Sequence, residues 1–219
     1  MSTKVKEKPA AAPPQSGSNV RNFIPYSDLR EWIEEADRLG ELVRANGLSA
    51  EEDIGLASEL IMHPEDAPCV LFGEIPGYEK GYRILVNFFG GKRQNMTLGF
   101  PTELSKLALS EAFYEDQLKD LEPIPHEIVA DGPVMENVFT GDDVDVLKFP
   151  TPLWHEADGG RYIGTGSFTA TLDLESDWMN VGTYRVMVHD RNHVGCYICP
   201  GKHGRIHRDK YEAAGKPMP

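Results

Sequence analysis

The spacing of apolar residues along the chain changes from helical to strand-like and back. From Leu29 to Leu39 apolar residues recur at intervals of three and four, which predicts a helix that ends at Gly40. Asp28 and Glu31 stand three residues apart at its start and form a capping box. The structured part of the chain is therefore expected to begin just before this helix.

The same alternation of helices and strands continues up to residue 125. Ser49 and Glu52 repeat the capping pattern ahead of a second helix, which Pro64 ends. A third helix is predicted from Thr102 to Leu121. The predicted strands are Glu41 to Arg44, Cys69 to Phe72 and Arg83 to Phe89. Residues 21–125 are therefore expected to form a small α/β domain.

Residues 126–219 have a different texture, with short runs of β-type residues separated by Gly and Asp. The clearest strands are Ile163 to Leu172, Asn180 to His189 and His193 to Cys199, with a hairpin turn at residues 190–192. The one predicted helix runs from Asp209 to Ala214. The sequence thus predicts an α+β chain whose second domain is dominated by strands.

Composition and charge narrow the functional classes. Residues 1–20 are rich in Pro, Ala, Ser and Lys and are expected to form a disordered tail. Acidic residues outnumber basic ones 35 to 22, which argues against a nucleic-acid surface. No apolar run reaches the roughly 20 residues of a membrane helix, and the N-terminus lacks the apolar core of a secretory signal. Three cysteines cannot all pair within the chain, so a reducing cytoplasm is expected.

Three side chains in the second domain suggest a site for an anion held through a metal. Asn180 offers a neutral oxygen ligand and His203 a nitrogen ligand, while Arg185 presents a planar fork suited to carboxylate or phosphate. Two protein ligands do not complete a metal site. Either other ligands come from a phosphate, water or another part of the protein, or the site holds no metal.

Each of these residues also has a simpler interpretation. Thr165 lies between two glycines, which fits a bulge or turn as well as a ligand contact. An arginine on a strand, such as Arg185, commonly reaches solvent, and a loop histidine such as His203 is commonly solvated. Cys196 and Cys199 have the spacing of redox and zinc sites, but the chain holds no second such pair.

Taken together, four stretches resemble the UbiD family of reversible decarboxylases, which use prenylated FMN. They are Tyr162 to Thr165, Trp178 to Asn180, Arg185 to Asp190, and Gly201 to His203. The intervals from Thr165 to Asn180, and from Asn180 to Arg185 and to His203, agree with that family. Residues 28–43 also resemble the family's beginning, so the resemblance covers residues 24–219.

The resemblance implies an architecture and a set of site residues. The small α/β domain would be followed by part of a split β-barrel that binds prenylated FMN. Asn180 and His203 would bind a divalent metal, usually Mn²⁺, which bridges to the cofactor phosphate, and K⁺ would lie close to Trp178. Arg185 would be catalytic, next to the substrate carboxylate. The residues implied near the flavin are Thr165, Gly182, Thr183, Tyr184, Arg185, Lys202 and His203.

The implied activity is the reversible decarboxylation of aromatic or α,β-unsaturated carboxylic acids. Its partners would be the acid and CO₂, a flavin prenyltransferase as the source of the cofactor, and further copies of the full-length protein in a homo-oligomer. The family's third metal-binding glutamate and its two catalytic glutamates are expected beyond Pro219, so the chain is expected to be the cofactor- and metal-binding N-terminal portion of the enzyme. The alternative is a non-catalytic flavin-binding module or an inactive fragment.

Overall fold

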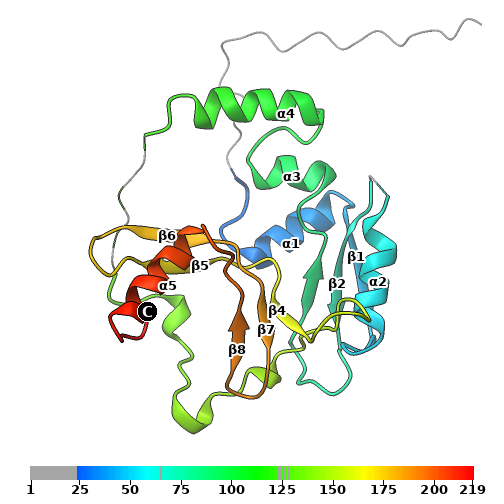
Figure 1. Ribbon diagram of the computed structural model, residues 1–219. Helices are drawn as coiled ribbons and strands as arrows, with labels where there is room; N and C mark the ends of the chain where they lie inside the picture. Colours follow the sequence, from blue (N-terminus) through cyan, green and yellow to red (C-terminus); the bar gives the residue numbers. More distant parts are fainter. Residues whose placement is uncertain (1–23, 65, 123–124, 126, 128) are drawn as a thin grey trace, which may run out of the picture. The chain divides into compact units, whose positions relative to one another are not determined.

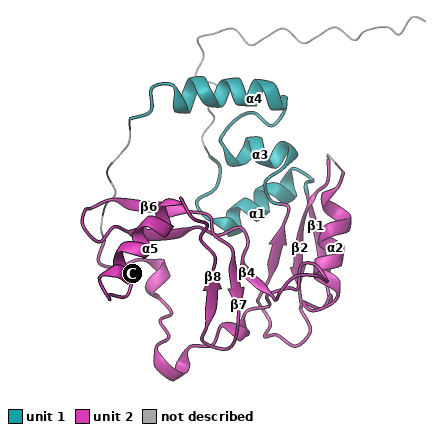
Figure 2. Cartoon of the chain, viewed as in Figure 1, with its two compact units in different colours: residues 1–41, 88–128 teal, residues 42–87, 129–219 magenta. Residues whose placement is uncertain are grey.

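The computed structural model describes residues 24–64, 66–122, 125, 127 and 129–219 (Figure 1). The tail expected at residues 1–20 lies outside the described residues. Contacts divide the chain into unit 1, residues 1–41 with 88–128, and unit 2, residues 42–87 with 129–219 (Figure 2). Each unit thus draws on two stretches of sequence, while the domain boundary expected after residue 125 stays a prediction.

The described part of unit 1 is built from helices. They are α1 (Leu29–Arg38), α3 (Gly91–Thr97) and α4 (Lys106–Phe113), the last followed by a π-helical turn (Tyr114–Leu118). The Asp28 carboxylate accepts hydrogen bonds from the backbone N–H groups of Arg30 and Glu31, which confirms the predicted start of α1. Trp32 is buried, and its indole N–H donates to Thr97 Oγ1 of α3 at 2.9 Å.

Two features of unit 1 differ from the sequence-based expectation. The helix predicted from Thr102 starts only at Lys106, because the Asn95 side-chain amide binds the carbonyl groups of Pro101, Thr102 and Leu104 and holds them in a loop. Helix α3 was not predicted at all. Its sequence is mostly polar, and its buried residues include Arg93, which pairs with Glu41 at 2.6 Å.

Unit 2 begins with a three-stranded sheet in the order β1-β2-β3. Strand β1 (Leu42–Asn46) runs parallel to β2 (Cys69–Gly73), and β3 (Ile84–Val86) pairs with β2 in the antiparallel direction. Helix α2 (Asp53–Met62) makes the crossover between the two parallel strands. The predicted strand from Arg83 to Phe89 is therefore confirmed only over Ile84–Val86.

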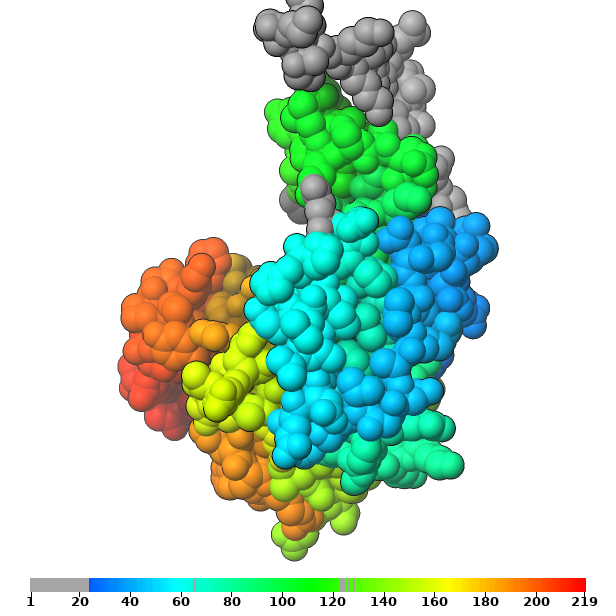
Figure 3. All heavy atoms as spheres, turned by 90° about the vertical axis from the view of Figure 1, so that its right-hand side faces the viewer, coloured from blue at the N-terminus to red at the C-terminus, as the bar shows by residue number. Residues whose placement is uncertain are grey.

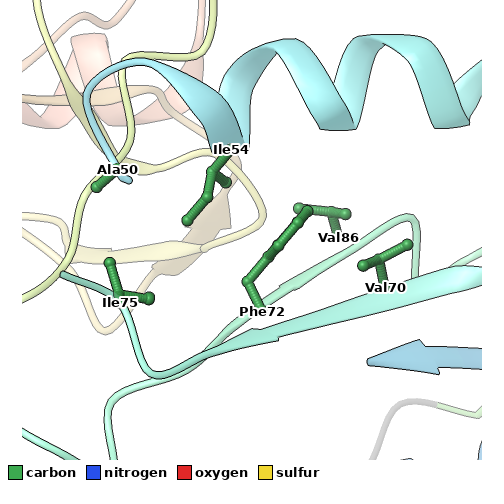
Figure 4. Close-up of a cluster of buried hydrophobic side chains, with 6 residues drawn as sticks. All are labelled: Ala50, Ile54, Val70, Phe72, Ile75 and Val86. Atoms are coloured by element: carbon green, nitrogen blue, oxygen red, sulfur yellow. The ribbon is translucent and has the colours of Figure 1, made fainter. Parts of the chain in front are cut away.

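Helix α2 packs on this sheet through one compact apolar cluster. Figure 4 shows Ile54 of α2 pointing toward Phe72 and Val86 of the sheet. The full buried set is Ala50, Ile54, Val70, Phe72, Ile75 and Val86. The other face of α2 is open to solvent, where Leu56 is 64% exposed, and the helix lies on the surface turned toward the viewer in Figure 3.

The rest of unit 2 contains two small antiparallel sheets and one long helix. The first sheet has the order β4-β7-β8, and the second is the pair β5 and β6. The strands are β4 (Tyr162–Gly164), β5 (Thr169–Leu172), β6 (Met179–Gly182), β7 (Val186–Val188) and β8 (Val194–Cys196). Helix α5 (His203–Ala213) packs against β5 and β6 (Figure 1). The hairpin turn predicted between β7 and β8 is confirmed.

Two of the predicted strands prove to be too long. The run from Ile163 to Leu172 and the run from Asn180 to His189 each break in the middle, and their two halves join different sheets. A bend at Thr165 and Gly166 interrupts the first run. Hydrophobic alternation continues across such breaks, so the pattern alone does not show where a chain changes sheets.

One segment ties the two stretches of unit 2 together. The backbone N–H of Leu153 donates to the Ala50 carbonyl at 3.0 Å, and Trp154 packs against the apolar cluster under α2. The Arg161 guanidinium reaches Glu51 and the Tyr78 hydroxyl at 3.2 and 3.0 Å. Mixed helix and strand content with small sheets is thus confirmed.

None of the helices in the described ranges has the length and apolar character that a membrane span requires.

Candidate functional site

The β5–β6 hairpin has an unusual distribution of polar and apolar side chains. Thr171 and Asn180 lie opposite each other in the pair and are buried, at 2% and 8% exposure. The next pair along, Leu172 and Met179, is exposed to solvent. Buried polar side chains beside exposed apolar ones reverse the usual alternation, and such a reversal is informative because burying polar groups is costly.

Two hydrogen bonds engage the nitrogen of the Asn180 amide. Its nitrogen Nδ2 lies 3.2 Å from Thr171 Oγ1 and 3.4 Å from Tyr184 Oη. An amide nitrogen carries two hydrogens, so these two contacts use both of them. Among the described residues, no donor is hydrogen-bonded to Asn180 Oδ1. That oxygen is the atom that Asn180 can offer to a cation.

Tyr184 links this amide to the start of α5. Its hydroxyl also accepts a hydrogen bond from the backbone N–H of Gly204 at 3.2 Å. The ring fits there because two neighbours have no side chain. A Cβ on Gly182 would lie 2.5 Å from Tyr184 Cζ, and a Cβ on Gly204 would lie 2.8 Å from its hydroxyl. Strand β6 and helix α5 therefore meet at one phenol group.

Helix α5 brings two histidines to the same tryptophan. His203 is the first residue of α5, and His207 lies one turn later on the same face. The Trp178 ring contacts both, with centroid distances of 4.8 Å to His203 and 4.6 Å to His207. His203 is exposed, whereas His207 is completely buried. The sequence predicts a loop at His203, whereas the structure places it in the first helical turn.

His207 belongs to a buried polar cluster. Its Nδ1 lies 3.0 Å from Thr171 Oγ1, and its Nε2 is buried without a hydrogen-bond partner among the described residues, 3.9 Å from Asp173 Oδ1. The Lys210 ammonium group binds both Asp173 oxygens, at 2.8 and 3.0 Å. The hydrogen bond from Lys210 lowers the pKa of Asp173 from 3.8 to about 2, with a smaller contribution from Ser176.

Arg185 lies in a different environment from Asn180 and His203. Its guanidinium sits 5.9 Å from the Tyr162 ring, and it lines a pocket of about 310 Å³. The pocket is also lined by Met187, His189, Cys196 and Tyr197. No hydrogen bond or ion pair joins Arg185 to Asn180 or His203 within the part of the chain that the structure describes. The pocket has room for a small carboxylic acid beside the positively charged guanidinium of Arg185.

The predicted site residues thus fall into three places. Trp178, Asn180, Gly182, Tyr184 and His203 gather around the start of α5. Lys202 belongs to the same place, because it is the N-cap residue of α5, and its side chain makes no capping hydrogen bond. Arg185 lines the separate pocket. Thr165 and Thr183 are exposed in the segments that follow β4 and β6.

Sequence reasoning missed four polar residues of the cluster, namely Thr171, Asp173, His207 and Lys210. The four-residue spacing of His203 and His207 was a usable signal, because it places both on one face if the helix begins early. In the described ranges, no group of three or more His, Cys, Asp or Glu side chains is arranged to hold a metal ion. Asn180 and His203 therefore supply two candidate ligands and no more.

Comparison with known proteins identifies relatives of this chain. The family model of the 3-octaprenyl-4-hydroxybenzoate carboxy-lyase Rift-related domain, UbiD, matches residues 127–219. The pyrrole-2-carboxylic acid decarboxylase of Pseudomonas aeruginosa is 31% identical over 204 residues, which are 88% of this chain and 40% of the relative. The chain belongs to the UbiD family.

Solved structures extend the comparison to the fold. The vanillic acid decarboxylase of Sedimentibacter hydroxybenzoicus, in closed form, matches with a TM-score of 0.79 at 30% identity, over 88% of this chain and 41% of that one. An evolved dimeric form of the UbiD-class enzyme HmfF from Pelotomaculum thermopropionicum, in complex with prFMN, matches with a TM-score of 0.70 at 25% identity, over 87% and 42%. The chain spans about two fifths of the length of these relatives.

Proposed function

We propose that this chain forms the cofactor- and metal-binding part of a reversible decarboxylase that uses prenylated FMN and acts on aromatic or α,β-unsaturated carboxylic acids. The observation that carries the proposal is the amide of Asn180, whose nitrogen is engaged by Thr171 and Tyr184. Its oxygen is thereby left for a cation close to the helix that His203 begins. The named activity of the Pseudomonas relative and the prFMN of HmfF support the same function.

The donor atoms suit the ions that we propose. Asn180 Oδ1 and a His203 ring nitrogen would bind Mn²⁺, for which oxygen and imidazole ligands are suitable. K⁺ would lie close to Trp178. Two protein ligands are too few for a full coordination shell, so the remaining ligands would be the cofactor phosphate, water and residues outside this chain.

The start of α5 suits a phosphate group. Backbone N–H groups at a helix N-terminus attract anions, and the N-cap residue Lys202 adds a positive charge next to His203. A local site of this kind would allow an acidic protein to bind a phosphate-bearing cofactor. We propose Thr165, Gly182, Thr183 and Tyr184 as further neighbours of the flavin.

Arg185 would bind the substrate carboxylate. A planar guanidinium makes two parallel hydrogen bonds to a carboxylate, which fixes the direction of the bond to be broken. When bound, prenylated FMN supplies an electrophilic centre that accepts the electron pair left by CO₂. The Arg185 pocket, with Tyr162 beside it, would orient the acid and keep it in register with the cofactor.

Several finer features belong to the same proposal. The sheets β4-β7-β8 and β5–β6 would form part of a split β-barrel. The full-length enzyme would be a homo-oligomer that receives its cofactor from a flavin prenyltransferase. We place it in the cytoplasm, where reduced cysteines persist, because three cysteines cannot all pair within the chain.

The test uses the 219-residue chain expressed together with a flavin prenyltransferase. We expect the purified protein to show the absorption spectrum of bound prenylated FMN and to retain Mn²⁺. Asn180→Ala and His203→Ala should each lower Mn²⁺ retention and cofactor content by about tenfold or more, because each removes one of two protein ligands. Metal analysis and ultraviolet-visible spectroscopy of the same samples measure both quantities.

Two exposed residues of the same types provide matched controls. Asn192 lies in the β7–β8 turn, and His155 lies in a surface loop. Asn192→Ala and His155→Ala should both keep the wild-type metal and cofactor content. Release of CO₂ from an acid by this chain alone would contradict its assignment as only the cofactor- and metal-binding part. A colourless, metal-free wild-type protein would contradict the proposed function.

A further inference from the structure

We infer that His207 is a positioning residue, which acts through Thr171 to hold the Asn180 amide with its oxygen toward the cation site. The inference deepens the proposed function and rests on it for the role of that oxygen. The direction of the hydrogen bonds that the inference requires can nevertheless be measured on the metal-free chain. None of the proposed catalytic or ligand roles uses His207.

Two consecutive hydrogen bonds connect helix α5 to strand β6 through Thr171. His207 of α5 is completely buried and its Nδ1 lies 3.0 Å from Thr171 Oγ1. Thr171 lies directly opposite Asn180 in the β5–β6 pair, and its hydroxyl is 3.2 Å from Asn180 Nδ2. Both distances lie within the usual range of hydrogen bonds.

The two hydroxyl groups beside Asn180 do not decide which way its amide lies. The Thr171 and Tyr184 hydroxyls can each donate or accept, so either could also bind an amide oxygen in the flipped orientation. With the amide flipped, the NH₂ group would face the cation site. A donor group repels a cation, so the flipped orientation would remove Asn180 as a ligand.

The position of the ring proton on His207 removes this ambiguity. With the proton on Nε2, Nδ1 is an acceptor and takes the single hydroxyl proton of Thr171, whose oxygen then accepts from the Asn180 NH₂ group. With the proton on Nδ1, the direction of both hydrogen bonds reverses and the amide oxygen turns toward Thr171. The tautomer of His207 therefore determines which amide atom Asn180 presents.

Asp173 selects the tautomer that favours the cation site. Its Oδ1 lies 3.9 Å from His207 Nε2, and its carboxylate is held ionised by Lys210, whose ammonium group binds both oxygens. At this distance the carboxylate is too far for a hydrogen bond, but in a buried site its charge acts over such a range. A negative charge attracts an N–H on Nε2 and repels a lone pair there.

The direct test is the tautomer of His207 in solution. Long-range ¹H–¹⁵N correlation spectra of the ¹⁵N-labelled, metal-free chain at neutral pH distinguish a ring nitrogen that bears a proton from one that does not. The signals of His207 are assigned by their loss in His207→Asn. We expect the proton on Nε2 and a bare Nδ1. A proton on Nδ1 would overturn the inference.

A second test measures the consequence for the metal. Thr171→Val removes the hydroxyl but keeps the shape, and we expect it to weaken Mn²⁺ binding by about tenfold, the usual scale for a residue that orients a ligand. Thr171→Ser keeps the hydroxyl and should keep the wild-type affinity. Titration of free Mn²⁺ followed by electron paramagnetic resonance gives both values.

His207, at the other end of this series of hydrogen bonds, offers an equivalent pair of variants. His207→Asn retains an acceptor near the position of Nδ1 and should bind Mn²⁺ more tightly than His207→Leu, which retains none. Far-ultraviolet circular dichroism confirms that each variant is folded before its affinity is compared. Equal Mn²⁺ affinities within both pairs would assign His207 and Thr171 a merely structural role and overturn the inference.

The two proposals fail in different ways. If the wild-type chain binds no Mn²⁺, the proposed function fails, while the tautomer of His207 still decides whether the amide is oriented as described. If the chain binds Mn²⁺ but His207 carries its proton on Nδ1, the proposed function stands and only the positioning role is lost.

Discussion

At the scale of single residues, the candidate site is organised around Tyr184. Its hydroxyl accepts from the Asn180 amide and from the Gly204 backbone, so one oxygen atom holds a strand and a helix together. The ring has room only because residues 182 and 204 are glycines. Neither glycine has the positive φ that favours this residue type, so their role is to permit close approach.

Gly182→Ala is expected to lower the free energy of unfolding by about 1–3 kcal/mol, because the added Cβ would displace a rigid ring. The new atom would lie 2.5 Å from Tyr184 Cζ. Urea denaturation followed by circular dichroism measures the change. Gly132→Ala is the control, since its Cβ would meet nothing within 4 Å and its backbone is extended. Equal stability of the two variants would contradict the proposed crowding.

The sequence identified some of these residues and not others for a physical reason. Asn180 and His203 stand in the motif stretches Trp178 to Asn180 and Gly201 to His203 and were therefore conspicuous. Thr171 and His207 have no such signal, because a threonine in a strand is common and His207 lay in a predicted loop. Their importance comes from burial, which depends on the packing of α5 against β5 and β6.

At the scale of elements, helix starts were predictable where capping side chains mark them. Asp28 marks α1, whereas α5 begins at His203, six residues before the predicted start at Asp209. The buried residues of α5 are Gly204, His207 and Tyr211, which are small, polar or aromatic. A search for apolar periodicity does not detect such a face.

The cap of α1 leads to a prediction about pH. The Glu31 N–H group that donates to Asp28 lowers the pKa of that carboxyl below its ordinary value of 3.8, so the stabilising contact is present above about pH 4 and is lost as the pH falls through the lowered pKa. Asp28→Asn keeps an N-cap side chain but does not titrate. We expect the two proteins to have similar urea midpoints at pH 6.

Below pH 4 the wild-type midpoint should fall further than that of Asp28→Asn, because only the wild type loses an ionised cap. All other carboxyl groups are common to both proteins, so their titration cancels in the comparison. Parallel midpoints from pH 6 to pH 2 would show that the Asp28 contact does not contribute to stability.

At the scale of the whole molecule, contacts unite residues that are distant in sequence. The segment that contains Leu153 and Arg161 packs onto α2 and its flanking residues, although Arg161 and Glu51 are 110 residues apart. Periodicity along a sequence carries no information about such pairings. The sequence thus predicted individual helices and strands better than the way in which residues 42–87 and 129–219 combine.

Gly55→Ala tests this packing. The added Cβ would lie 2.2 Å from the Leu153 carbonyl oxygen, and backbone atoms cannot move aside as a flexible side chain can. We expect a loss of about 2–3 kcal/mol in the free energy of unfolding, measured by urea denaturation. Leu56→Ala, at an exposed position of the same helix, should change it by less than about 0.5 kcal/mol. A Gly55→Ala protein as stable as Leu56→Ala would refute the contact.

The Tyr184 hydroxyl accepts hydrogen bonds from both Asn180 and Gly204, and this sharing has an energetic consequence. Because Tyr184 connects the amide to the first turn of α5, occupancy of the site and docking of α5 are thermodynamically linked. A ligand at one hundred times its Kd adds about 2.7 kcal/mol to the state that binds it. Any ion that binds Asn180 should therefore slow amide hydrogen exchange along α5, and any change that loosens α5 should release the ion by the same free energy.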